Sequence, residues 1–121
     1  MEFADLQHRL RDFADERDWH RFHTPKNLAM ALAGEAGELV EIFQWLTPEQ
    51  SRAVMDDPRI AEQVRHELAD VLAYLVRLAD VLDVDLLSAS ADKLRVNEAK
   101  YPVELARGRA DKYDRLRDEC E

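Results

Sequence analysis

Two pairs of carboxylates, each with a spacing of three residues, lie within the most regular apolar patterns of this sequence. They are Glu35 with Glu38, and Glu67 with Asp70. Residues three apart lie on one face of an α-helix, so two such helices packed together would bring four acids into one place. Crowded, partly buried carboxylates repel one another and lose hydration. A hard divalent cation such as Mg²⁺ prefers oxygen ligands and relieves both effects.

Spacing alone does not identify a metal site, because 26 of the 121 residues are acidic and pairs such as Asp12 with Asp15 share the spacing. Their position in the hydrophobic pattern distinguishes the two pairs from the others, because Glu35 and Glu67 each lie within an apolar stripe. The stripes are formed by Leu28, Leu32, Leu39 and Ile42 around Glu35, and by Ile60, Val64, Val71, Leu75, Leu78 and Leu82 around Glu67. Two interpretations remain open at this point, a metal site or a buried network of carboxylates with arginine partners.

Aromatic residues flank the first acidic pair. Trp19 and Phe22 precede the segment that carries it, and Trp45 follows that segment. Flat rings near a cation can stack on a nucleobase, and His23 could donate a hydrogen bond to a base or phosphate. The alternative is that the rings belong to the hydrophobic core and that His23 is an ordinary surface residue.

Four carboxylates holding Mg²⁺ would suit phosphoryl chemistry, because the ion neutralises phosphate charge and lowers the pKa of a bound water. Lys93 and Asn97 fall on adjacent turns of a later predicted helix, where they could hold phosphates. The alternative for this pair is a solvated helix face.

The elements that position these residues are predicted to be helices. Only three Gly and four Pro interrupt the chain, and no segment alternates like a strand. Thr24-Pro25, Thr47-Pro48 and Asp57-Pro58 are typical helix starts, with a capping side chain followed by proline. We predict an all-α protein of four long helices and one short connecting helix that oligomerises into helical bundles. The long helices cover residues 3–18, 25–44, 58–82 and 86–101, the short one begins after Thr47, and residues 19–23 form a loop.

Composition indicates one domain over residues 1–121, with residues 103–121 as a polar C-terminal tail. The net charge of -9 disfavours binding to a nucleic-acid polymer. The first residues are charged where a signal peptide needs an apolar run, and no segment reaches membrane-spanning length, so we expect a cytoplasmic protein with no membrane partner. The single cysteine, Cys120, cannot form an intrachain disulfide.

Residues 71–82 are apolar on nearly every side of their predicted helix. A helix of this kind must be enclosed. Three further helices of so short a chain could hardly cover it and also leave a substrate cleft. We therefore predict a second subunit, in a homodimer or homotetramer.

Four sequence blocks span most of the chain. They are ERDWHRFHTPKNL at 16–28, GEAGELVEIFQW at 34–45, ELADVLAYL at 67–75 and KLRVNEAKYPV at 93–103. In this order they resemble the MazG-like all-α nucleoside triphosphate pyrophosphohydrolases, and within that family the dCTP diphosphatase branch. The paired ExxE and ExxD look like the family's Mg²⁺ signature, and the WxxFH block and the QW ending are similar to the branch.

The resemblance implies an enzyme that hydrolyses dCTP, or a related dNTP, between the α- and β-phosphates to give a nucleoside monophosphate and pyrophosphate. It implies Mg²⁺ as cofactor, with Mn²⁺ as a substitute, and dimers or dimers of dimers. The site residues that it implies are Glu35, Glu38, Glu67 and Asp70 for the metal, Lys93 and Asn97 for the phosphates, and Trp19, Phe22, His23, Trp45 and Tyr74 for the base and sugar.

Among the carboxylates, we take Glu38 as the group that orients or deprotonates the attacking water. One position departs from the family pattern, because relatives carry a His nine positions before the pocket Trp and this chain has Leu10 there, with His8 nearest. That departure leaves the base preference open. The alternatives are a broad, dUTP-directed or modified-dNTP pyrophosphohydrolase and, from another class, a non-catalytic acidic helical oligomerisation module.

Overall fold

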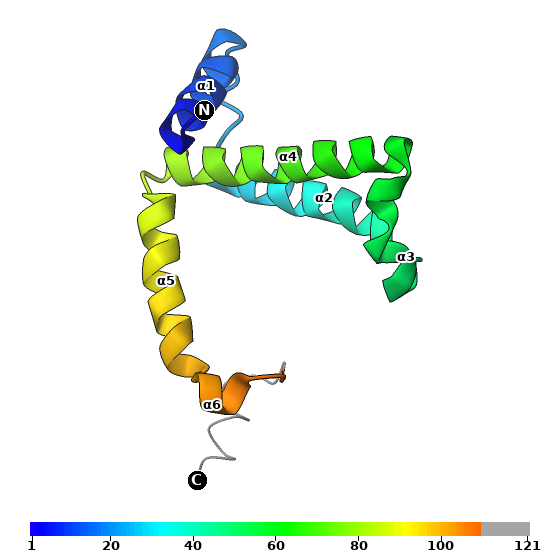
Figure 1. Ribbon diagram of the computed structural model, residues 1–121. Coiled ribbons are helices and arrows are strands. Elements are labelled where there is room, and N and C mark those ends of the chain that lie inside the picture. Colours follow the sequence, from blue (N-terminus) through cyan, green and yellow to red (C-terminus); the bar gives the residue numbers. More distant parts are fainter. Residues whose placement is uncertain (110–121) are drawn as a thin grey trace. The chain divides into compact units, whose positions relative to one another are not determined.

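The computed structural model describes residues 1–109, which form helices joined by turns (Figure 1). No strand occurs within this range, and the predicted all-α class is confirmed. The elements are α1 (Phe3–Glu16), α2 (Pro25–Phe43), α3 (Pro48–Arg52), the 3₁₀-helix η1 (Val54–Asp56), α4 (Pro58–Val81), α5 (Leu86–Lys100) and α6 (Val103–Ala106).

The helix starts follow the capping signals in the sequence. The Thr24 hydroxyl accepts a hydrogen bond from the backbone N–H of Asn27 at 3.2 Å. Thr47 and Gln50 form a capping box, in which each side chain accepts from the backbone N–H of the other. Asp57 caps α4 in a similar way. Proline follows each of these caps, where its missing N–H would have had no partner within the helix.

The structure differs from the prediction in two unexpected short helices and in the helix ends, of which those of α2, α4 and α5 come one residue early. Helix α1 ends at Glu16, two residues early, because Asp18 adopts a left-handed conformation with φ of 55° that cannot continue a helix. The 3₁₀-helix η1 was not predicted, and it buries Val54. The predicted polar tail begins with the short helix α6, and the rest of that tail, including Cys120, lies outside the described residues.

The chain divides into two compact units, Met1–Val84 and Asp85–Glu121. In the first unit α2 and α4 lie side by side, and α1 packs against α4 (Figure 1). Leu28 of α2 and Val64 of α4, which belong to the two apolar stripes, are buried in this unit, as is Val76, whereas Leu75 and Leu82 of the second stripe are exposed. This packing determines where the acids within those stripes point. The single-domain organisation and the cytoplasmic location stay predictions.

The apolar stretch 71–82 is only partly covered by the other elements of the first unit. Val76 and Ala79 are buried, whereas Leu72 is 43% exposed and Leu82 is 52% exposed. None of the residues of α5 is buried. Among the described residues, no helix is both long enough and apolar enough to cross a bilayer.

Candidate functional site

Packing α2 against α4 brings three of the predicted acids together. Carboxylate oxygens of Glu35, Glu38 and Glu67 lie within 4.8 Å of one another, with Glu35 and Glu67 half-buried and Glu38 exposed. We call these three residues the acidic cluster. Asp70, on the next turn of α4 after Glu67, is exposed and lies outside this group. It lines a cavity together with Glu35, so the fourth predicted ligand is placed beside the cluster rather than within it.

Two oxygens of the acidic cluster have no partner. Glu35 Oε2 and Glu67 Oε2 are buried, and neither has a hydrogen-bond partner in the described part of the chain. A buried, ionised oxygen without a donor is unfavourable. Within residues 1–84 the arginine ion pairs involve other acids, such as Asp80, so the alternative of a carboxylate network with arginine partners lacks support here. A divalent cation with oxygen ligands would satisfy both atoms, and the donor set therefore fits a hard metal ion.

The crowding of these acids opposes their ionisation. Burial, followed by the neighbouring Glu38 and Glu67, raises the pKa of Glu35 to about 7. Burial also raises the pKa of Glu67, and Glu38 and Asp70 act in the same direction. Such shifts are common where a protein binds ligands, and a bound cation would reverse them by favouring the ionised forms.

We expect Glu35 to contribute progressively less stability to the metal-free protein as pH rises from about 4.5 to about 7. The pKa of Glu35 in the folded state, about 7, lies above its ordinary value of 4.5. In that interval the folded state binds more protons than the unfolded state, so the free energy of unfolding falls with pH. Thermal unfolding in EDTA between about pH 5 and pH 8 measures the slope. Glu35→Gln should flatten it, and equal slopes in both proteins would contradict the shift.

A cavity of about 300 Å³ opens beside Glu35 and Asp70. Aromatic rings form part of its wall. Phe13 and Trp19 meet edge to face with ring centroids 5.7 Å apart, and the His23 ring lies 6.2 Å from that of Trp19. The full lining is Leu10, Phe13, Ala14, Trp19, His23, Glu35, Asp70, Ala73, Tyr74 and Arg77. Flat apolar walls with a few polar groups at one side are typical of small-molecule sites.

The predicted base-pocket residues separate into two groups. Trp19, His23 and Tyr74 line the cavity. Phe22 and Trp45 do not line it, and they are 55% and 86% exposed, respectively. An exposed tryptophan at the end of α2 is available to a ligand or to a second chain. The roles of Phe22 and Trp45 stay predictions.

The predicted phosphate contacts lie on α5, in the second unit. Lys93 and Asn97 share a shallow hollow with Ala89, Ser90 and Leu94. Their spacing therefore places them on one face of the helix. Their role toward phosphates stays a prediction.

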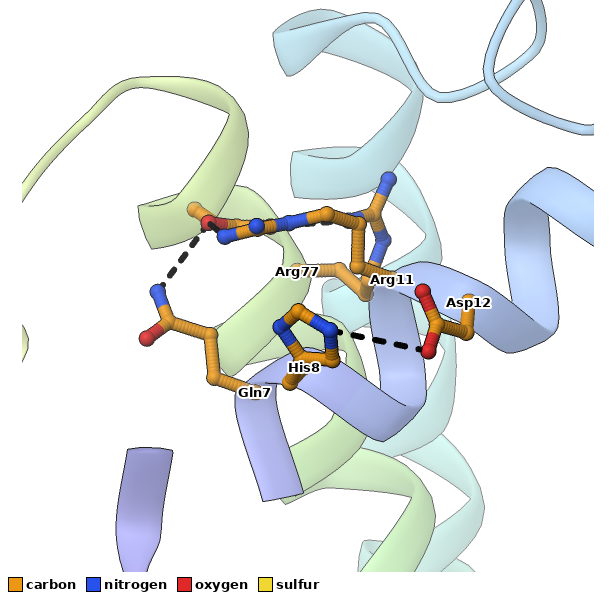
Figure 2. Close-up of polar contacts among 6 residues, drawn as sticks. Gln7, His8, Arg11, Asp12 and Arg77 are labelled. Carbon is orange, nitrogen blue, oxygen red and sulfur yellow. Dashed lines mark hydrogen bonds and ion pairs between the residues drawn. The ribbon is translucent and has the colours of Figure 1, made fainter. Parts of the chain in front are cut away.

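The position that departs from the family pattern is part of the cavity wall. Leu10 lines the cavity, whereas His8 is exposed and its Nε2 lies 3.7 Å from Asp12 Oδ2 on the same helix (Figure 2). His8 therefore does not replace the absent histidine. The apolar side chain of Leu10 therefore occupies the position at which the family pattern has a histidine.

Reasoning from the sequence missed a polar cluster at the cavity wall. Arg77, which is only 7% exposed, donates from Nε to His23 Nδ1 at 3.4 Å and from Nη1 to Asp80 Oδ2 at 3.1 Å. Asp80 also accepts from Arg11 at 2.6 and 2.9 Å and from Gln7 at 3.1 Å. Figure 2 shows Gln7 and Arg11 of α1 reaching toward α4 beside Arg77. Two charges three residues apart inside the apolar stretch 71–82 were the signal that could have found it.

Comparisons with known proteins show the family and the fold of this chain. The sequence pattern of the MazG-like family matches residues 31–116. Over 112 residues the chain is 46% identical to dCTP pyrophosphatase 1 of Bos taurus and 45% identical to dCTP pyrophosphatase 1 of Homo sapiens. These matches cover 93% of this chain and 66% of each relative, so the chain spans slightly less than two thirds of their length. The fold is similar to that of a pyrophosphatase from Archaeoglobus fulgidus, with a TM-score of 0.77 and 42% identity over 82% of this chain and 91% of the other.

Proposed function

We propose, because the chain belongs to the MazG-like family, that it is a metal-dependent pyrophosphohydrolase that cleaves dCTP, or a related dNTP, to the nucleoside monophosphate and pyrophosphate. Relatives named dCTP pyrophosphatase 1 and a pyrophosphatase of similar fold support this reaction. The observation that carries the proposal is the position of Glu35, which belongs to the acidic cluster and also lines the aromatic cavity. A triphosphate held at the cluster would place its base against flat rings.

We propose that Glu35, Glu38, Glu67 and Asp70 hold Mg²⁺, with Mn²⁺ as a substitute. The unpartnered oxygens of Glu35 and Glu67 support this assignment. When bound, the ion neutralises phosphate charge and lowers the pKa of a coordinated water. The chain's own contribution is to hold four carboxylates on two packed helices, so that the charged end of the substrate has one fixed position.

Glu38 is the proposed general base. It is the exposed member of the acidic cluster, so water can reach its carboxylate while Glu35 and Glu67 stay half-buried. It would accept a proton from the water that attacks the substrate. The bond between the α- and β-phosphates would break, and pyrophosphate would leave. The base would stack against Trp19 and Tyr74, a contact worth about 1 to 3 kcal/mol per base. The remaining proposed contacts are His23, Phe22 and Trp45 for base and sugar, and Lys93 and Asn97 for phosphates.

A panel of nucleotides tests the proposed function. The protein is incubated with each dNTP and NTP and with 5-methyl-dCTP in the presence of Mg²⁺, and pyrophosphate is assayed against orthophosphate. We expect pyrophosphate and dCMP from dCTP. Preference for dUTP or for the modified nucleotide, or equal turnover of all, would support the alternative substrates that Leu10 leaves open. No turnover with Mg²⁺ or Mn²⁺ would contradict the proposal and favour the non-catalytic oligomerisation module.

We also propose a homodimer or homotetramer. Leu68, Leu72 and Leu75 are exposed on successive turns of α4, at 52%, 43% and 36%. Apolar surface that continues along a helix is usually covered by a partner. Sedimentation at micromolar concentration should give a species of at least two chains, and Leu72→Glu should shift it toward the monomer. A monomeric wild-type protein would contradict this part of the proposal.

A further inference from the structure

We propose that Arg77 is a positioning residue that fixes His23 as the neutral tautomer with its proton on Nε2, so that His23 presents a hydrogen-bond donor to an acceptor on the nucleotide's base. The inference rests on the proposed function, because it assigns a role to two residues of the same cavity. It concerns which nitrogen of one ring carries the proton, and this can be measured without any substrate.

The contact between the two side chains determines the tautomer. Arg77 Nε lies 3.4 Å from His23 Nδ1 and donates to it. A guanidinium keeps its protons at all physiological pH values and cannot accept a hydrogen bond. His23 Nδ1 must therefore present its lone pair, and the single proton of the neutral ring resides on Nε2.

Arg77 is itself held in place, so it acts as a fixed donor. It is 7% exposed, and its Nη1 donates to Asp80 Oδ2 at 3.1 Å. Asp80 is anchored in turn by Arg11 and Gln7 of α1. Because the carboxylate is bound from both helices, the guanidinium cannot turn away from His23 without losing its ion pair.

The surroundings also keep the ring uncharged. Burial, followed by the positive charge of Arg77, lowers the pKa of His23. At neutral pH the ring is therefore not a cation competing for phosphate. It offers one donor and, because Nδ1 is already occupied, no free acceptor.

That donor is available to a ligand. His23 and Arg77 both line the cavity, and no described residue accepts a hydrogen bond from His23 Nε2. The ring lies beside Trp19, which supplies a stacking surface. A base stacked on such a surface is read along its polar edge, and cytosine carries acceptors there at O2 and N3. A hydrogen-bond donor in this cavity wall would therefore pair with an acceptor of a cytosine base.

Nitrogen NMR of the histidine rings tests the tautomer directly. In substrate-free wild-type protein labelled with ¹⁵N, we expect His23 to show an unprotonated Nδ1 and a protonated Nε2, with its signals identified by their loss in His23→Asn. In Arg77→Met the two tautomers should exchange and the shifts should average. Arg52→Gln is the matched control, because Arg52 pairs with Glu49 on the surface of α3 and does not line the cavity. A protonated Nδ1 or averaged shifts in the wild type would overturn the proposal whether or not any nucleotide is hydrolysed.

Kinetics with dCTP tests the consequence. Loss of one positioned hydrogen bond in Arg77→Met should raise KM about tenfold and change kcat less than about threefold. His23→Gln, whose amide can reach the position of Nε2, should retain more affinity than His23→Asn, and Arg52→Gln should behave as the wild type. Asp80 keeps Arg11 and Gln7 in Arg77→Met, so we expect that variant to fold, as circular dichroism can verify. A raised KM with an unchanged tautomer would mean that Arg77 contacts the nucleotide directly, and an unchanged KM with a lost tautomer would exclude the positioning role.

Discussion

Replacing Glu35 with glutamine is expected to lower kcat for pyrophosphate release by at least about a thousandfold, or about 4 kcal/mol of transition-state stabilisation, while the protein remains folded. Glu35 connects the acidic cluster to the aromatic cavity, and its buried Oε2 has no other described partner. The substitution removes a charged ligand and keeps the side chain's shape. In EDTA the variant should unfold at the same temperature as the wild type or higher, because one of several repelling charges is gone.

Glu62→Gln is the matched control for this experiment. Glu62 lies on α4, as Glu67 does, but it is exposed and its carboxylate lies 3.9 Å from His66 at the surface. We expect wild-type activity and an unchanged melting temperature, since an exposed pair of this kind contributes little. Full activity of Glu35→Gln would refute the metal assignment, and equal losses in both variants would show that charge in general, rather than this cluster, matters.

Mg²⁺ at about one hundred times its Kd is expected to raise the free energy of unfolding by about 2.7 kcal/mol, and EDTA should reverse the gain and abolish hydrolysis. The physical reason is that only the folded chain holds Glu35, Glu38 and Glu67 within 4.8 Å of one another. A bound cation removes their repulsion and satisfies the two unpartnered oxygens. Thermal unfolding, monitored by calorimetry during a Mg²⁺ titration, measures the shift.

Potassium chloride at equal ionic strength separates specific binding from screening of the net charge of -9. It should stabilise the protein much less than Mg²⁺ does. Glu67→Gln should lose most of the Mg²⁺ effect, whereas Glu62→Gln should retain it. If potassium chloride produced the whole shift, the acidic cluster would not be a metal site.

The helices could be predicted because their signals are local. Thr24, Thr47 and Asp57 each cap a helix within three residues along the chain, and proline follows each of them. The early end of α1 was missed because it depends on the left-handed backbone of Asp18, which the residue type permits but does not require. Helix η1 was missed because its three residues make less than one α-helical turn, so no helical repeat can show in them.

The acidic pairs could also be predicted in part. A spacing of three residues places two carboxylates on one helix face whatever the rest of the fold does. Which of the four carboxylates would meet could not be predicted, because that depends on how α2 lies against α4. That packing places Glu67 with Glu35 and Glu38, and it leaves Asp70 at the cavity. Proximity in sequence was a poor guide to the aromatic residues, since Trp19 lines the cavity and Phe22, three residues later, does not.

The sequence by itself determined the helices, their apolar faces and the acids placed within them, because these properties repeat every few residues. Only the tertiary structure decided what meets across the fold. The contact between Arg77 and His23 joins residues 54 apart in the chain, and the one between Arg11 and Asp80 joins residues 69 apart. No repeating pattern in the sequence signals either contact, because each depends on how whole helices pack. The carboxylates could therefore be found in the sequence, while the polar wall of the cavity beside them appeared only once the helices were packed.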